Sequence, residues 1–152
     1  MIVAIGNDHA GIELKKEIVS LLNEMNIECL DRGTDGSQCV DYPDFGEKVS
    51  KEVSAGKVDR GILICGTGIG MSIVANKFPN IRASLCNDLF TAKMSRLHND
   101  ANILVIGGRI VGSGLAKEIV RVWFNTQFEG GRHADRLNKI KQIEERLIKH
   151  GL

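Results

Sequence analysis

The sequence has no excess of charge of either sign, with 20 Lys and Arg against 19 Asp and Glu in 152 residues. Such a balance provides no general attraction to nucleic acid or to an anionic membrane, so any anion site has to be local. Internal repeats, low-complexity tracts and a linker rich in Pro or Ser are also lacking. With 43% hydrophobic residues, this length predicts one domain, residues 1–152, with a single core.

The sequence also lacks a Cys-x-x-Cys pair. Its four cysteines, Cys29, Cys39, Cys65 and Cys86, are spaced too widely for a zinc or thioredoxin-type site, and a disulfide framework is not expected. The first eight residues contain no basic leader and only a short apolar run, so we expect neither a signal peptide nor a membrane span. The expected compartment is the cytoplasm, where thiols stay reduced.

Short apolar runs rich in Val and Ile alternate with segments of helical period. This pattern is typical of a parallel sheet covered by helices on both faces. The expected strands are Ile2–Gly6, Ile27–Asp31, Gly61–Cys65, Arg82–Cys86 and Ile103–Gly107.

Helices are expected at about residues 10–25 and 42–55, after Gly70, from about Ser113 and from about Asp135. In the first, the apolar stripe leaves Lys15 facing water. The last helix either covers the sheet or docks onto a second subunit, and its periodicity favours neither alternative. The apolar residues expected on the inner faces are Leu115, Ile119 and Val122 in the helix from Ser113, and Leu137, Ile140, Ile143 and Leu147 in the last.

Ligands of such a sheet collect where strands end and helices begin. Cys65 ends an expected strand and is followed by Gly66, Gly68 and Gly70. Glycines let backbone N–H groups converge on an oxyanion or phosphate, and a cysteine beside them is favoured as the reactive thiolate. The alternative is a buried structural cysteine beside a tight turn. The glycine array favours the functional interpretation.

Known glycine-rich motifs do not fit this loop. Its Gly-x-Gly-x-Gly spacing differs from the dinucleotide fingerprint, and the lysine of a Walker A loop is missing. A cysteine phosphatase would need an arginine six residues after its nucleophile, where this chain has Met71. We therefore expect an activated thiol above an anion cradle of another kind.

Two further sets of residues are candidates for chemistry. Asp8 and His9 follow the first strand and could enter the same crevice, although Asp8 could equally cap a helix. His98 precedes the fifth strand, and on its own it is more typical of a solvated loop residue than of a catalyst.

Arg132 and Arg136 are four residues apart, so at a helix start they lie one above the other. Two stacked guanidinium groups can hold a phosphate, with His133 beside them and Arg109 as a further contributor. The alternative is a solvated basic turn.

Together, the stretches 7–11, 65–72, 87–88, 98–102 and 107–109 resemble the ribose-5-phosphate isomerase B family, which is related to the galactose-6-phosphate isomerase subunits. The resemblance implies a Rossmann-like three-layer α/β/α fold with a five-stranded parallel sheet. It implies interconversion of ribose 5-phosphate and ribulose 5-phosphate without a metal or an organic cofactor. The alternatives are a galactose-6-phosphate isomerase subunit, an isomerase of allose 6-phosphate, and a regulatory module that binds a nucleotide or a sugar phosphate without activity.

The resemblance also implies a role for each site residue. Cys65 moves a proton between C1 and C2 through an enediolate, which the loop amides stabilise. His98 opens the sugar ring with help from Asp8 and Thr67. The family forms dimers, often paired into tetramers, in which His98 and Asn99 face the Cys65 loop of a partner, and the C-terminal helix is expected to take part in dimer packing. The remaining positions implied to bind substrate are Gly66, Gly68, Ile69 and Gly70 of the loop, Asn99 for the hydroxyls, and His9, Arg109, Arg132 and Arg136 for the phosphate.

Overall fold

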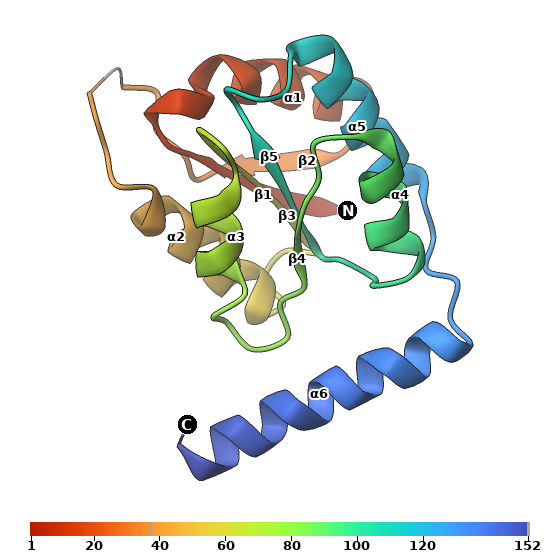
Figure 1. The fold of residues 1–152 in the computed structure, drawn as a ribbon. Helices are drawn as coiled ribbons and strands as arrows, with labels where there is room; N and C mark the ends of the chain where they lie inside the picture. The colour runs from red at the N-terminus through yellow and green to blue at the C-terminus, as the bar shows by residue number, and fades with distance from the viewer. Residues whose placement is uncertain (37, 152) are drawn as a thin grey trace.

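The computed structural model describes residues 1–36 and 38–151. Within them, five parallel strands form one sheet in the order β2-β1-β3-β5-β4 (Figure 1). All five predicted strands are confirmed, with ends that differ by at most one residue. They are β1 (Ile2–Asn7), β2 (Glu28–Asp31), β3 (Arg60–Cys65), β4 (Ala83–Leu85) and β5 (Ile103–Gly107).

Helices cover both faces of the sheet, as expected. One core lies between the sheet and α1, α4 and α5, and a second lies between the sheet and α2 and α3 (Figure 1). Because β3 and β5 are buried from both sides, their sequences are continuous apolar runs. The helices are α1 (Ile12–Glu24), preceded by a short 3-10 turn, η1 (His9–Gly11), then α2 (Tyr42–Ser54), α3 (Ile69–Ala75), α4 (Leu89–Leu97), α5 (Ser113–Asn125) and α6 (Arg132–His150).

Lys15 does not face water as predicted, since its side chain is only 2% exposed. Its ammonium binds the carboxylates of Asp31 and Asp35 at 2.8 and 2.6 Å and the carbonyl oxygen of Thr34 at 3.1 Å. Burial would lower the pKa of Lys15, but the hydrogen bonds and charges of the two carboxylates outweigh it and raise that pKa. The prediction was wrong because these acceptors come from β2 and the loop after it.

The buried face of α5 differs from the predicted one. Ile119 is fully buried, but Leu115 is 44% exposed and Val122 is only partly buried. Trp123, the largest fully buried side chain, lies on the inner face instead. The inner face is therefore rotated by about one residue from the predicted stripe.

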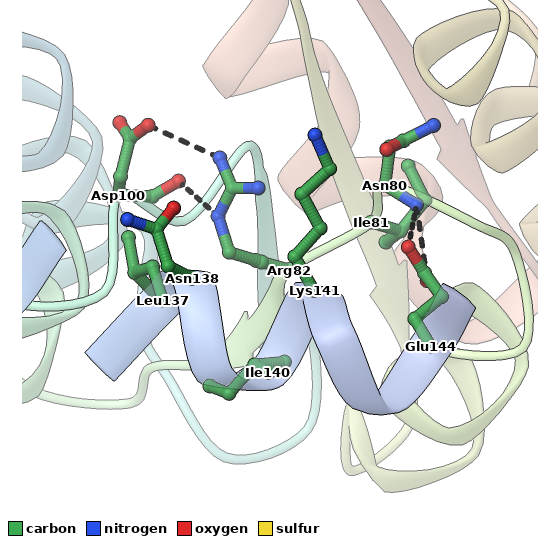
Figure 2. Close-up of a pocket in the computed structure, with 9 residues that line it drawn as sticks. All are labelled: Asn80, Ile81, Arg82, Asp100, Leu137, Asn138, Ile140, Lys141 and Glu144. Atoms are coloured by element: carbon green, nitrogen blue, oxygen red, sulfur yellow. Dashed lines mark hydrogen bonds and ion pairs between the residues drawn. The ribbon is translucent and has the colours of Figure 1, made fainter. Parts of the chain in front are cut away.

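Helix α6 extends away from the sheet rather than covering it (Figure 1). Its apolar residues Ile140, Ile143 and Leu147 are 44 to 53% exposed. A groove separates α6 from the loop before β4, and across it the Asn80 N–H donates to both carboxylate oxygens of Glu144 at 3.0 and 3.1 Å (Figure 2). The sheet-covering alternative is therefore wrong, while docking onto a second subunit stays a prediction.

Candidate active site

The carboxyl ends of β1 and β3 lie at a topological switch point, where the strand order of the sheet reverses. The chain passes from β1 through α1 to β2 on one side, and then through α2 to β3 on the other side of β1. Because α1 and α2 cover opposite faces, the strand ends between them are the usual place for a ligand site in such a sheet. Asp8 follows β1 and Cys65 ends β3, and the Asp8 N–H donates to the Ile64 carbonyl at 3.2 Å. Asp8 is thus held beside Cys65.

The loop after Cys65 directs an amide at its sulfur. Cys65 is 4% exposed, and the Gly68 N–H donates to its Sγ at 3.2 Å. Gly68 has a φ of +81°, and a β-carbon there would lie 2.4 Å from Leu85 Cδ1. This position therefore requires glycine. Next to it, the Ile69 N–H donates to Thr67 Oγ1 at 3.3 Å, so the hydroxyl is held at the mouth of the loop.

Asp8 and His9 lie on the same edge of the sheet, as predicted from their position. Asp8 is buried and caps η1 by accepting a hydrogen bond from the Ala10 N–H at 2.9 Å, so the capping alternative is present as well. His9 Nδ1 accepts a hydrogen bond from the Val40 N–H at 3.3 Å, and its Nε2 lies 4.0 Å from Cys39 Sγ. When Nδ1 accepts this bond, Nε2 is the ring nitrogen that carries the proton.

Arg109 reaches the same edge from the end of β5. Its N–H donates to the Gly66 carbonyl at 3.0 Å, and its side chain passes beside Gly66. Tyr42, at the start of α2, is a neighbour that the sequence did not indicate. Its ring packs so closely on Gly70 that a β-carbon there would lie 2.6 Å from Tyr42 Cε2. No spacing rule connects two such distant positions, so only the fold reveals this contact.

His98 and Asn99 lie at the opposite, amino edge of the sheet. His98 is the C-cap of α4, and the next strand, β5, begins at Ile103. Along the paired strands β3 and β5, Gly61 faces Ile103 and Cys65 faces Gly107. Four residues of strand separate the two edges by about 13 Å. A single chain therefore does not bring His98 to Cys65.

The arginines at the start of α6 share the amino edge with His98. The His133 ring stacks on that of His98 with a centroid distance of 4.1 Å, which places Arg132 and Arg136 nearby. Burial, followed by the charges of His98 and the two arginines, lowers the pKa of His133 despite the opposing effect of Glu129. The predicted phosphate residues are therefore divided within one chain, with His9 and Arg109 at the carboxyl edge and Arg132 and Arg136 at the amino edge.

A helix-covered parallel sheet with a thiol, a carboxylate and a backbone amide at one switch point is typical of a Rossmann-like α/β/α enzyme. Among the described residues, no helix is both long and apolar enough to cross a membrane.

The chain belongs to the ribose/galactose isomerase family, whose model matches residues 3–140. It is 51% identical to ribose-5-phosphate isomerase B of Escherichia coli over 144 residues, 95% of this chain and 97% of that one. The fold superposes on ribose-5-phosphate isomerase B of Clostridium thermocellum with a TM-score of 0.93, at 53% identity and with 96% and 99% of the two chains covered. The enzyme of Mycoplasma genitalium, solved with bound ribulose-5-phosphate, gives a TM-score of 0.92 at 37% identity, with 95% and 96% covered.

Proposed function

We propose that this chain is an aldose–ketose isomerase that interconverts ribose 5-phosphate and ribulose 5-phosphate. The observation that carries the proposal is the carboxyl-edge site, where the Gly68 amide donates to Cys65 Sγ and Asp8 is fixed beside that cysteine. Relatives named for this reaction match the chain over nearly its whole length. The cytoplasm, where a thiol stays reduced, is the compartment that suits this chemistry.

The proton transfer needs one base and one anion cradle. The Cys65 thiolate removes the proton from C2 of the open-chain aldose, and the electron pair forms the C1–C2 double bond of an enediolate. The thiol then returns the proton to C1 while the hydroxyl proton of O2 passes to O1, which yields the ketose. Backbone N–H groups of residues 66–70 stabilise the charge that develops on the sugar oxygens. One such donor contributes about 3–4 kcal/mol in the oxyanion hole of an acyl-transfer enzyme. No redox partner is required, since the substrate is oxidised at C2 and reduced at C1.

The remaining roles fall to residues from both edges of the sheet. His98 opens the ring with Asp8 and Thr67, and Asn99 binds sugar hydroxyls. His9, Arg109, Arg132 and Arg136 hold the phosphate. Because about 13 Å of strand separates the edges within one chain, one substrate meets all these groups only where the amino edge of a second copy faces the Cys65 loop.

The surface supports such a pairing. Four apolar side chains around the carboxyl edge are 54 to 72% exposed, namely Ile69, Ile73, Phe90 and Ile110. Large apolar side chains exposed around one edge of a folded chain are typical of an interaction surface. The exposed apolar side of α6 provides a second one. We therefore propose a homodimer, or a pair of such dimers, with active sites at the interface.

The test is a kinetic assay of the purified chain, alone, with ribose 5-phosphate, allose 6-phosphate and galactose 6-phosphate. We expect turnover of ribose 5-phosphate, together with exchange of the transferred proton with solvent. Activity that needs a second, different chain would instead support the galactose-6-phosphate isomerase alternative. Saturable binding with no proton exchange would indicate a binding module and contradict the proposal.

A further inference from the structure

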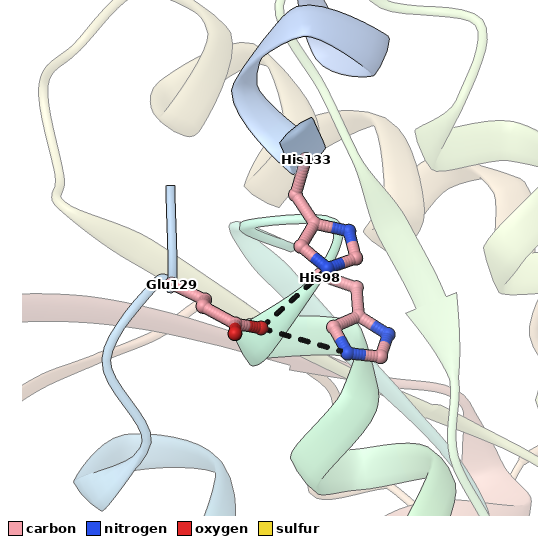
Figure 3. Close-up of side chains that lie close together, drawn as sticks. All are labelled: His98, Glu129 and His133. Carbon is pink, nitrogen blue, oxygen red and sulfur yellow. Dashed lines mark ion pairs between the residues drawn. The ribbon is translucent and has the colours of Figure 1, made fainter. Parts of the chain in front are cut away.

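Two imidazole rings and one carboxylate meet at the amino edge of the sheet (Figure 3). Oε2 of Glu129 lies 3.8 Å from Nε2 of His98 and 3.5 Å from Nε2 of His133. The ligand atoms of the three residues all lie within 4.8 Å of one another. Two imidazoles and a carboxylate are also the ligand set of a three-residue zinc site with an open fourth position.

The backbone, and not chance contact of long side chains, assembles this cluster. The Glu129 N–H donates to the Leu97 carbonyl at 3.0 Å, which ties the segment before α6 to the end of α4. Gly130 and Gly131 then adopt φ values of +72° and +53° and turn the chain into α6. This turn places Glu129 and His133 on the same side of the helix start, facing His98.

His133 carries an independent sign of a missing ligand. Its side chain is 5% exposed, and its Nε2 is buried with no hydrogen-bond partner among the described residues. Buried polar atoms nearly always have a partner, so an orphaned nitrogen that faces a carboxylate and a second imidazole indicates a ligand.

We propose that His98, Glu129 and His133 form a binding site for a divalent transition-metal ion, Zn²⁺ above all, and that the bound ion inhibits the enzyme. The inhibition rests on the proposed function, in which His98 opens the sugar ring, because a metal-bound imidazole can no longer transfer protons. The metal binding itself does not depend on that function.

The geometry suits Zn²⁺ after a small adjustment. A tetrahedral site with bonds of about 2.0–2.1 Å separates its ligand atoms by about 3.3–3.5 Å, close to the observed 3.5 and 3.8 Å. The rings are now parallel within 6°, and their lone pairs converge on one ion only when the rings tilt apart. His98, at 36% exposure, has the room to turn.

Charge and ligand type define the ion further. Arg132 and Arg136, near the start of α6, oppose a cation, while the Glu129 carboxylate attracts it. Mg²⁺ and Ca²⁺ prefer oxygen ligands, so a site with two imidazoles selects against them.

The experiment titrates chelator-treated, full-length protein with Co²⁺, whose visible d–d absorption reports tetrahedral coordination. We expect one saturable Co²⁺ per chain and its displacement by Zn²⁺. Glu129→Gln, a nearly isosteric change at a half-exposed side chain, and His133→Ala should each weaken binding about tenfold or more. His150→Ala, at the far end of α6, is the matched control and should bind as the wild type does.

The proposed site would be overturned if the Co²⁺ band were absent. It would also be overturned if the His133→Ala and Glu129→Gln variants bound Co²⁺ as tightly as the wild type. Anomalous scattering from crystals soaked in Zn²⁺ locates the ion without any variant, and an ion held elsewhere would overturn it too. Zn²⁺ should inhibit wild type and His150→Ala at the concentration that displaces Co²⁺. A chain that isomerises normally with Zn²⁺ bound would refute the inhibition. A Co²⁺ band in a chain without any isomerase activity would instead refute the proposed function and leave the metal site standing.

Discussion

Inactive variants of the two sheet edges should complement each other when they share a dimer. Cys65 and His98 lie on opposite edges of the sheet, which four residues of strand separate by about 13 Å, so an interface site takes Cys65 from one chain and His98 from the other. A mixed dimer of Cys65→Ala and His98→Ala chains then has one site with both groups intact and one with neither. Random pairing makes about half of the dimers mixed, so the pool should recover about a quarter of the wild-type activity.

The assay co-expresses the two variants with different affinity tags, and mass spectrometry measures the mixed fraction. Activity should rise linearly with the mixed fraction, and the homodimers of each variant alone should both be inactive. Co-expression of wild type with the Cys65→Ala/His98→Ala double variant is the matched control. If each active site is shared between two chains, every mixed dimer in this control is inactive, and the pool keeps about a quarter of the wild-type activity. If each site lies within one chain, the pool keeps about half of it. A mixed pool that stays at the level of its parents would refute the shared site.

Two other predictions concern single positions. Gly68→Ala should lower the free energy of unfolding by about 2–5 kcal/mol, because φ is +81° and the β-carbon would lie 2.4 Å from Leu85 Cδ1. Gly66→Ala is the control: the nearest atom to its β-carbon is 3.6 Å away, so it should cost at most about 0.5 kcal/mol. Urea unfolding measures both free energies, and equal losses would contradict the loop geometry. Burial and Asp31 raise the pKa of Cys29 to about 11, so the Cys29 thiol stays protonated at pH 8. Cys29 should therefore resist iodoacetamide at pH 8, while the exposed Cys39 reacts. Peptide mass spectrometry that finds both cysteines labelled at the same rate would contradict this prediction.

The sheet could be predicted because its strands are buried on both sides. Such strands need continuous Val and Ile runs, and these runs stand out from the polar segments between them. The carboxyl-edge residues were also predictable, because Asp8 and Cys65 directly follow or end such runs.

Helix α4 could not be predicted in the same way. Its buried residues are Ala92, Ser95 and Arg96, while its large apolar Phe90 is 72% exposed. This inverts the usual amphipathic pattern, so periodicity gave no signal. The same applies to Lys15, whose burial depends on carboxylates supplied by a distant loop.

The division of the site between two edges was not visible in the residues themselves. His98 and Arg132 are polar residues at helix ends, and their residue types alone do not tell how far each lies from Cys65. The strand register supplies that information, since Cys65 pairs with the last residue of β5 while His98 precedes its first. The resemblance to a family, and not the spacing of residues, led to the expectation of a partner subunit.

We propose that Cys65 is the base that moves the proton, and NMR in deuterated water follows that proton. Wild type should incorporate deuterium at the transferred position of ribose 5-phosphate while it forms ribulose 5-phosphate. Cys65→Ala should still bind the sugar phosphate, but its exchange and turnover should both fall by at least about 100-fold, as expected for loss of a catalytic base. Exchange at near-normal rates in Cys65→Ala would contradict the account.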